Sequence, residues 1–162
     1  MRAFVVLLAA LVLTASAAAL PPRAGILVPG RSLGGLSLGA TPGRVRSIWG
    51  SRYGVCRDCD RLTWYFNYRR FDKRGVGVSF RRGRAAALFT LWAPAGWHTT
   101  RGLKIGDSAS LITGLYGPLL RVDCGTYSAE ILKRGRTTTA FYVVDEKIWG
   151  FGLSRAAERV CR

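Results

Sequence analysis

Apolar and polar residues recur with two different periods along the chain. Val45, Ile48 and Trp49 are spaced by three and one, so they fall on one apolar face of a short predicted helix. Over residues 76–80 the period changes to two, because apolar residues alternate there with Gly and Ser. Such alternation is typical of a strand with one buried face. The pattern therefore predicts short helices combined with antiparallel strands.

A short motif occurs twice. GLSLGATPGRVRSIWG starts at Gly35, and GLKIGDSASLITGLYG starts at Gly102, 67 residues later. Each copy has a hydroxyl residue that predicts the N-cap of a helix and a final glycine that predicts the end of that helix. These residues are Thr41 and Gly50 in the first copy, and Ser108 and Gly117 in the second. The repetition predicts two units built alike.

Three strand-like segments follow each predicted helix. They are 62–68, 76–81 and 86–93 in the first unit, and 128–133, 139–144 and 148–153 in the second. We therefore predict an α+β fold of two tandem repeats, each consisting of one helix plus a three-stranded antiparallel meander. The two meanders could merge into one curved sheet with both helices on one face.

The N-terminal sequence has the order of a secretory signal peptide. Arg2 precedes an apolar run that ends in small residues, and Ala19 is the cleavage point that we favour over Ala17 and Ala18. An uncleaved anchor is the alternative, although the apolar run is shorter than the roughly 20 residues of a spanning helix. We expect a secreted or extracytoplasmic protein with no transmembrane helix in the mature chain. The predicted divisions are signal peptide 1–19, N-terminal linker 20–33, first repeat 34–93, join 94–100, and second repeat with a C-terminal tail 101–162.

The chain is strongly basic, with a formal net charge of +16 that comes mostly from arginine. A GC-rich genome would explain this through codon usage. Attraction to a polyanion, such as nucleic acid, anionic lipid or a wall polymer, would explain it through function. Along the sequence the arginines are scattered, with short clusters at 69–70 and 81–84.

Four cysteines in an exported chain predict two disulfides. Of the three pairings that are open, we favour Cys56–Cys59 and Cys124–Cys161, the second of which would tie the C-terminal tail to the body of the protein. The C-x-x-C at 56–59 leaves two alternatives. A redox site would need a stabilised thiolate, which the flanking aspartates disfavour, and a zinc site would need Cys124 and Cys161 as further ligands.

No sequence feature predicts catalysis. GGLSLGATPG differs from a phosphate-binding loop because Ala40 stands at the lysine position, where the second copy has Asp107. His98 is the only histidine, and no serine lies in a G-x-S-x-G context. We expect a protein that is not an enzyme, with no catalytic residue, metal ligand or cofactor.

The richest aromatic segment lies in the first unit. Trp64, Phe66 and Tyr68 would face one side of a strand and Tyr65 the other, so one face packs on the helix and the second could meet a partner. The predicted binding residues are Trp64, Tyr65, Phe66, Tyr68, Arg69 and Arg70.

The sequence GLSLGATPGRVRSIWG followed by a strand meander resembles the helix-plus-sheet modules of the beta-lactamase inhibitor proteins and of small outer-membrane assembly lipoproteins. The chain departs from them in its basic charge, its cysteine placement and its lack of a lipid-attachment cysteine. The resemblance implies a non-catalytic module that binds an extracellular or envelope protein. Binding to an anionic polymer, either wall polymer or nucleic acid, is the first alternative, and an uncharacterised secreted enzyme is the second.

Overall fold

The computed structural model describes residues 22, 24–56, 58–66 and 75–162. Strands account for 49% of the structure and helices for 11%, so the protein is mostly β. The predicted α+β fold of two helix-plus-meander repeats is therefore wrong. Within the described residues, twelve strands form two separate sheets, and both helices are short. The prediction failed because the lead-in and connecting segments, which have little apolar alternation, also form strands.

The large sheet has eight strands in the order β4-β5-β6-β7-β12-β11-β10-β9, and all neighbours are antiparallel. Each half is a run of four consecutive strands, not three, and the two runs meet where β7 pairs with β12. The strands of the first run are β4 (Tyr53–Cys56), β5 (Thr63–Phe66), β6 (Gly75–Arg81) and β7 (Arg84–Leu91). Those of the second run are β9 (Leu120–Asp123), β10 (Ser128–Arg134), β11 (Thr137–Val144) and β12 (Lys147–Arg155).

The small sheet has the order β3-β2-β1-β8. Its strands are β1 (Gly25–Val28), β2 (Ser32–Leu33), β3 (Leu36–Ser37) and β8 (Trp97–Thr99). Gly34 and Gly35 join β2 to β3 with φ of 55° and 79°, the left-handed conformation that a two-residue hairpin turn needs. The predicted linker 20–33 and join 94–100 thus contain strands, and they pair in parallel through β1 and β8.

Two short helices precede the strand runs. Helix α1 (Pro42–Trp49) begins as predicted, since the Thr41 hydroxyl accepts a hydrogen bond from the Arg44 backbone N–H. Helix α2 (Ser110–Tyr116) starts one residue later than predicted, and its N-cap is Ala109 instead of Ser108; Ala109 makes no side-chain cap hydrogen bond. Neither helix has the length and hydropathy needed to cross a membrane.

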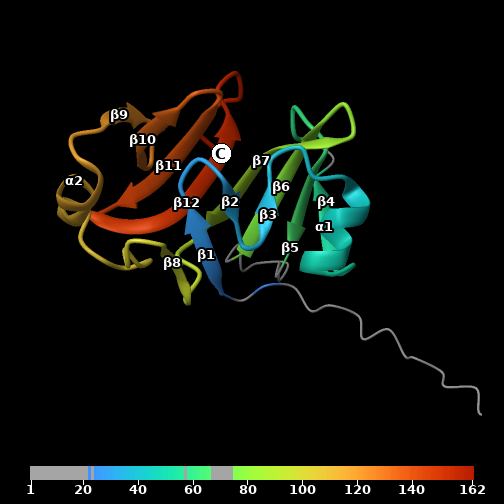
Figure 1. Cartoon of the computed structure of the whole chain (residues 1–162), viewed down its shortest axis with the longest axis horizontal. Coiled ribbons are helices and arrows are strands. Elements are labelled where there is room, and N and C mark those ends of the chain that lie inside the picture. Colours follow the sequence, from blue (N-terminus) through green and yellow to red (C-terminus); the bar gives the residue numbers. More distant parts are fainter. Residues whose placement is uncertain (1–21, 23, 57, 67–74) are drawn as a thin grey trace, which may run out of the picture.

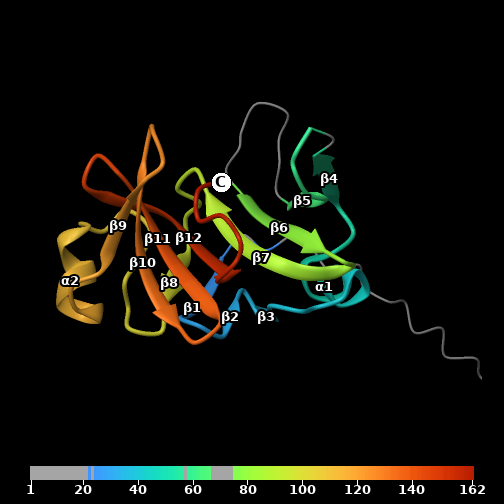
Figure 2. The ribbon, with the colours of Figure 1, turned by 90° about the horizontal axis from the view of Figure 1, so that it is seen from above.

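The helices and the small sheet cover one side of the large sheet, which we call the first face. Figure 1 shows α1 and α2 at opposite ends of the molecule, and Figure 2 shows α1 and the small sheet along the same side of the large sheet. Trp49 of α1 packs edge-on against Phe66, and Tyr116 of α2 packs against Phe141. The main hydrophobic core lies between these layers. The predicted signal peptide 1–19 lies outside the described residues.

Candidate functional site

The opposite side of the large sheet, which we call the second face, has a smaller apolar cluster. Its buried members are Phe89, Leu91, Ala129, Ile131, Ala140 and Tyr142. The pairing of β11 with β12 shifts register beside this cluster. Tyr142 pairs with Gly150, whereas the next residue, Val143, pairs with Ile148. Trp149 is the extra residue of this bulge, and it packs on the second-face cluster. Bulges of this kind are frequent beside functional sites because they re-aim a side chain.

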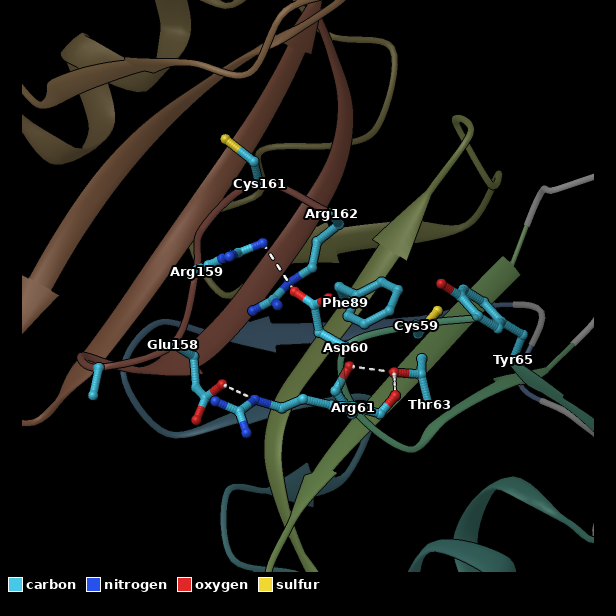
Figure 3. Close-up of a pocket in the computed structure, with 12 residues that line it drawn as sticks. Cys59, Asp60, Arg61, Thr63, Tyr65, Phe89, Glu158, Arg159, Cys161 and Arg162 are labelled. Atoms are coloured by element: carbon cyan, nitrogen blue, oxygen red, sulfur yellow. Dashed lines mark hydrogen bonds and ion pairs between the residues drawn. The ribbon is translucent and has the colours of Figure 1, made fainter. Parts of the chain in front are cut away.

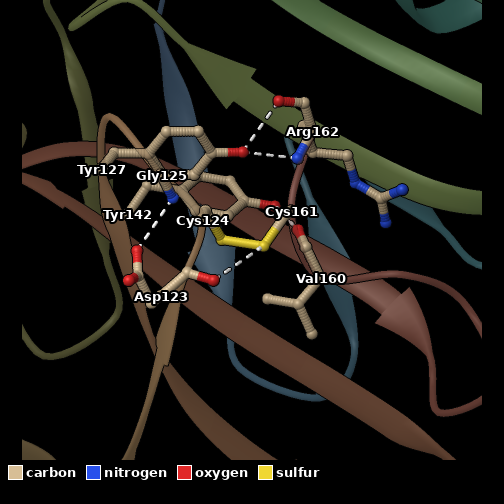
Figure 4. The surroundings of a disulfide bond; sticks show 8 residues. All are labelled: Asp123, Cys124, Gly125, Tyr127, Tyr142, Val160, Cys161 and Arg162. Atoms are coloured by element: carbon tan, nitrogen blue, oxygen red, sulfur yellow. Dashed lines mark hydrogen bonds between the residues drawn. A yellow bond between two sulfur atoms is a disulfide. The ribbon is translucent and has the colours of Figure 1, made fainter.

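Residues 156–162, which we call the C-terminal segment, lie across part of the second face. The disulfide Cys124–Cys161 ties this segment to the end of β9 (Figure 4). The Tyr127 hydroxyl donates to the Arg162 carbonyl at 2.8 Å, and the Tyr142 hydroxyl donates to the Val160 carbonyl at 2.9 Å. The segment is therefore held by covalent and polar contacts at several points, as the predicted Cys124–Cys161 pairing implied.

A groove of about 470 Å³ runs between the C-terminal segment, the loop after β4 and strands β5 to β7 (Figure 3). Phe89 lies in it, with the guanidinium of Arg162 5.4 Å from the centre of its ring. Gly77 permits this placement, because a Cβ atom on Gly77 would stand 2.4 Å from the Phe89 ring. The groove is thus floored by an aromatic ring and bordered by charged side chains.

One buried carboxylate organises the charges of this groove. Glu158 is 8% exposed, and it accepts from Arg61 Nε at 2.8 Å and lies 3.4 Å from Arg81 Nη1. Asp60 pairs with Arg159 at 2.9 Å on the exposed rim. Each of these carboxylates has an arginine partner, and the ion pairs of Glu158 with Arg61 and of Asp60 with Arg159 hold the C-terminal segment to the loop after β4.

Burial changes the acidity of one tyrosine under the segment. The Tyr142 side chain lies inside the second-face cluster, and loss of solvation raises its pKa to about 12; the nearby charge of Arg162 acts in the opposite direction. Tyr142 is therefore a neutral hydrogen-bond donor over the physiological range. Its role here is to position the segment through the Val160 carbonyl.

Three neighbouring, partly exposed aromatic side chains of the second face form what we call the aromatic row: Trp92, Trp149 and Tyr127. The rings of Trp92 and Trp149 are 5.2 Å apart, and those of Trp149 and Tyr127 are 5.3 Å apart. Trp92 is 43% exposed. Its φ is 67° and that of Ala93 is 48°, an unfavourable conformation for both residues that the bond from Ala93 N–H to the Trp149 carbonyl helps to hold.

The structure separates the residues that the sequence grouped as a binding site. Trp64 and Phe66 are buried on the first face, so their side chains belong to the core and are not available to a partner. Tyr65 lies on the second face, lines the groove and packs edge-on against Phe89. Tyr68, Arg69 and Arg70 lie outside the described residues.

The C-x-x-C cysteines are joined to each other, as predicted. Cys56 ends β4 and bonds Cys59, and the next element is strand β5, not the helix that a redox motif usually opens. Within the described part of the chain, no three His, Cys, Asp or Glu side chains are grouped so that they could hold a metal ion. His98 lies in β8 of the small sheet, on the other side of the molecule from the groove.

The sequence did not predict the aromatic row, although it did predict that Cys124–Cys161 would tie the C-terminal tail to the body of the protein. Trp149 reaches the second face through a bulge, and Trp92 reaches it through a left-handed turn. Neither feature can be recognised from the spacing of apolar residues along the sequence. The available signal was one tryptophan inside each of the predicted strands 86–93 and 148–153, and a tyrosine just before the predicted strand 128–133.

No protein-family model matches the chain, and no curated protein sequence matches it significantly. Three solved structures are similar in fold. A DUF4309 family protein from Bacillus subtilis is 18% identical, with a TM-score of 0.56 over 76% of this chain and 84% of that one. An extracellular protein containing a SCP domain from Bacillus anthracis is 10% identical, with a TM-score of 0.54 over 74% of this chain and 44% of that one.

The third similar structure is a cysteine-rich secretory protein from Staphylococcus aureus, 18% identical, with a TM-score of 0.53 over 85% of this chain and 50% of that one. The chain therefore spans about half of the second and third proteins. At these identities the likeness concerns the fold alone. These neighbours are neither beta-lactamase inhibitor proteins nor assembly lipoproteins, and the resemblance drawn from the sequence stays a prediction.

Proposed function

We propose that this protein is an exported, non-catalytic binding module that holds a partner protein against the second face of its large sheet, at the cell envelope or outside the cell. Export is supported by the two disulfides, which form and persist in oxidising compartments. It is also supported by structural neighbours that are described as extracellular and secretory. Residues 1–19 would then be the signal peptide.

One observation carries the choice of surface. The aromatic row keeps three large rings at the surface of the second face, while the first face is covered by both helices and the small sheet. Tryptophan and tyrosine contribute most to protein interfaces because they bury a large area and lose little conformational freedom. The fixed backbone at Trp92 would preserve the arrangement before a partner arrives.

The test is affinity capture from a cell-envelope fraction, followed by calorimetry with the captured partner. Trp92→Ala and Tyr127→Ala should each weaken binding by at least about thirtyfold, the effect typical of a central aromatic residue of an interface. Leu111→Ala is the matched control, because Leu111 is a similarly exposed apolar residue on α2 and lies off the second face. Equal affinity of wild type and both aromatic variants would refute the proposed surface.

A further inference from the structure

Arginines gather at one end of the large sheet, where five adjacent strands each contribute one. We call them the basic row: Arg81 at the end of β6, Arg84 at the start of β7, Arg155 at the end of β12, Arg136 just before β11, and Arg134 at the end of β10. The strand register aligns them, since Arg81 pairs with Arg84, Thr137 with Arg155, and Arg134 with Thr137. In Figure 1 these strand ends lie along the upper edge of the molecule. Residues that are scattered in the sequence thus form a line in the fold.

The row is exposed and carries excess positive charge. All five of its arginines are exposed, and Arg82 and Lys133 add two further exposed bases beside it. Glu158 offsets part of the charge of Arg81. Within the described residues, no carboxylate lies at ion-pair distance from the other four arginines.

Two of these guanidinium groups lie beside the same residue, Gly39. Arg84 Nη1 donates to the Gly39 carbonyl at 3.5 Å, and Arg155 Nη2 lies 3.9 Å from the position that a Cβ atom on Gly39 would occupy. An anion bound beside Gly39 would be attracted by both positive charges. The guanidinium group also presents several N–H donors in a plane, which suits phosphate oxygens.

The shape of the row identifies the kind of anion. Four inter-strand steps separate β6 from β10, so the row extends for about 19 Å along the sheet end. A line of this length on an exposed edge fits a chain of charges better than a single small anion. Single-stranded nucleic acid is usually bound with aromatic rings that stack on its bases, and the basic row has none.

We propose that the basic row binds a linear phosphodiester polymer that lacks bases, of the kind found in a cell envelope. This inference goes beyond the proposed function, because it uses a different surface and needs no protein partner. The codon-usage explanation of the net charge makes the contrary prediction that binding depends only on how many charges the chain carries.

The experiment compares two variants of equal net charge. Arg84, Arg134, Arg136 and Arg155 are replaced by Gln in the row variant, and Arg52, Lys104, Arg121 and Lys147 are replaced by Gln in the control variant. The control residues are exposed and lie away from the row. Affinity is measured by calorimetry over a range of salt concentrations for poly(glycerol phosphate), for an oligothymidylate of equal phosphate number and for hyaluronate. Circular dichroism checks that both variants fold.

The row variant should bind poly(glycerol phosphate) at least tenfold more weakly than wild type at about 50 mM salt, whereas the control variant should stay within about threefold. The slope of log affinity against log salt should become shallower by about 3, since each lost phosphate contact contributes about 0.7 for a single-stranded polyanion. Equal losses in the two variants would overturn the site. Tighter binding of the oligothymidylate or of hyaluronate would overturn the phosphodiester polymer as its ligand.

Discussion

The two faces of the large sheet are covered in different ways. The first face is sealed by two helices and a second sheet, and its largest side chains, such as Trp49 and Phe66, are completely buried. The second face is covered only in part, by seven residues that a disulfide, two tyrosine hydroxyls and a buried glutamate hold in place. The difference indicates that apolar burial on the first face stabilises the fold. The covering of the second face is less complete, so it is less constrained by that burial.

Removing a large side chain from the first face should have the largest effect on stability. Phe66→Ala should lower the free energy of unfolding by about 3 to 5 kcal/mol, because it deletes a fully buried ring that contacts Trp49 and Tyr53. Denaturation by urea would measure the change. The neighbouring Tyr65 points to the second face and is half-buried, so Tyr65→Ala should cost less than half as much. Equal losses would mean that the two faces contribute alike.

Removing the disulfide of the second face should have the next largest effect. Replacing Cys124 and Cys161 together by Ser frees a loop closed over a sequence separation of 37 residues and should cost about 4 kcal/mol on chain-entropy grounds. Replacing Cys56 and Cys59, which are separated by 3 residues, should cost about 2 kcal/mol. Thermal unfolding of the two double variants would compare them.

Hydrogen exchange would locate the change caused by the first of these variants. We expect faster exchange in β9 and β10, with helix α1 and strands β4 to β7 unchanged, because the lost tie joins the C-terminal segment to the end of β9. Faster exchange throughout the chain would show that the segment supports the whole fold.

Ionisation of Tyr142 at alkaline pH should change the free energy of unfolding less than the loss of Phe66 or of the Cys124–Cys161 disulfide. Its folded pKa of about 12 lies above its ordinary value of 10.0, so the native state keeps a proton that the unfolded state loses first. The contribution to stability is therefore complete below pH 10 and is lost as the pH rises toward 12, with a total on the order of 2 to 3 kcal/mol. Tyr142→Phe should be less stable at neutral pH, since it loses the bond to Val160, and its stability should fall less between pH 10 and 12. Parallel curves for both proteins would contradict this account.

Sequence reasoning predicted the local features of the fold well. Thr41, Pro42 and Gly50 define the first helix through rules that involve only neighbouring residues, and α1 has these limits. Two disulfides followed from the compartment and the number of cysteines, and the bonds present are those of the pairing that we favoured among three. The glycines of GGLSLGATPG serve a hairpin turn and the entry to α1, which accounts for their likeness to a phosphate-binding loop.

The features that depend on distant residues could not be predicted in this way. Simple alternation assigns each residue of a strand to a face, but a bulge at Trp149 changes the assignment near the start of β12. The same alternation correctly put Trp64 and Tyr65 on opposite faces, yet it could not say which face is buried, because that depends on where α1 packs. The basic row could not be predicted from the sequence either. Its arginines are distant in the sequence, and only strand pairing brings Arg84 beside Arg155.

The parallel pairing of β1 with β8 also bears on how the chain reaches its native state. Gly25 pairs with Trp97, which lies about seventy residues further along the chain, although β1 also pairs with the nearby β2. Within each four-strand run of the large sheet the paired strands follow one another in the sequence, and close pairings generally form earlier than distant ones. We therefore expect the two runs to assemble first, and the β7–β12 and β1–β8 pairings, whose residues are far apart in the sequence, to form later.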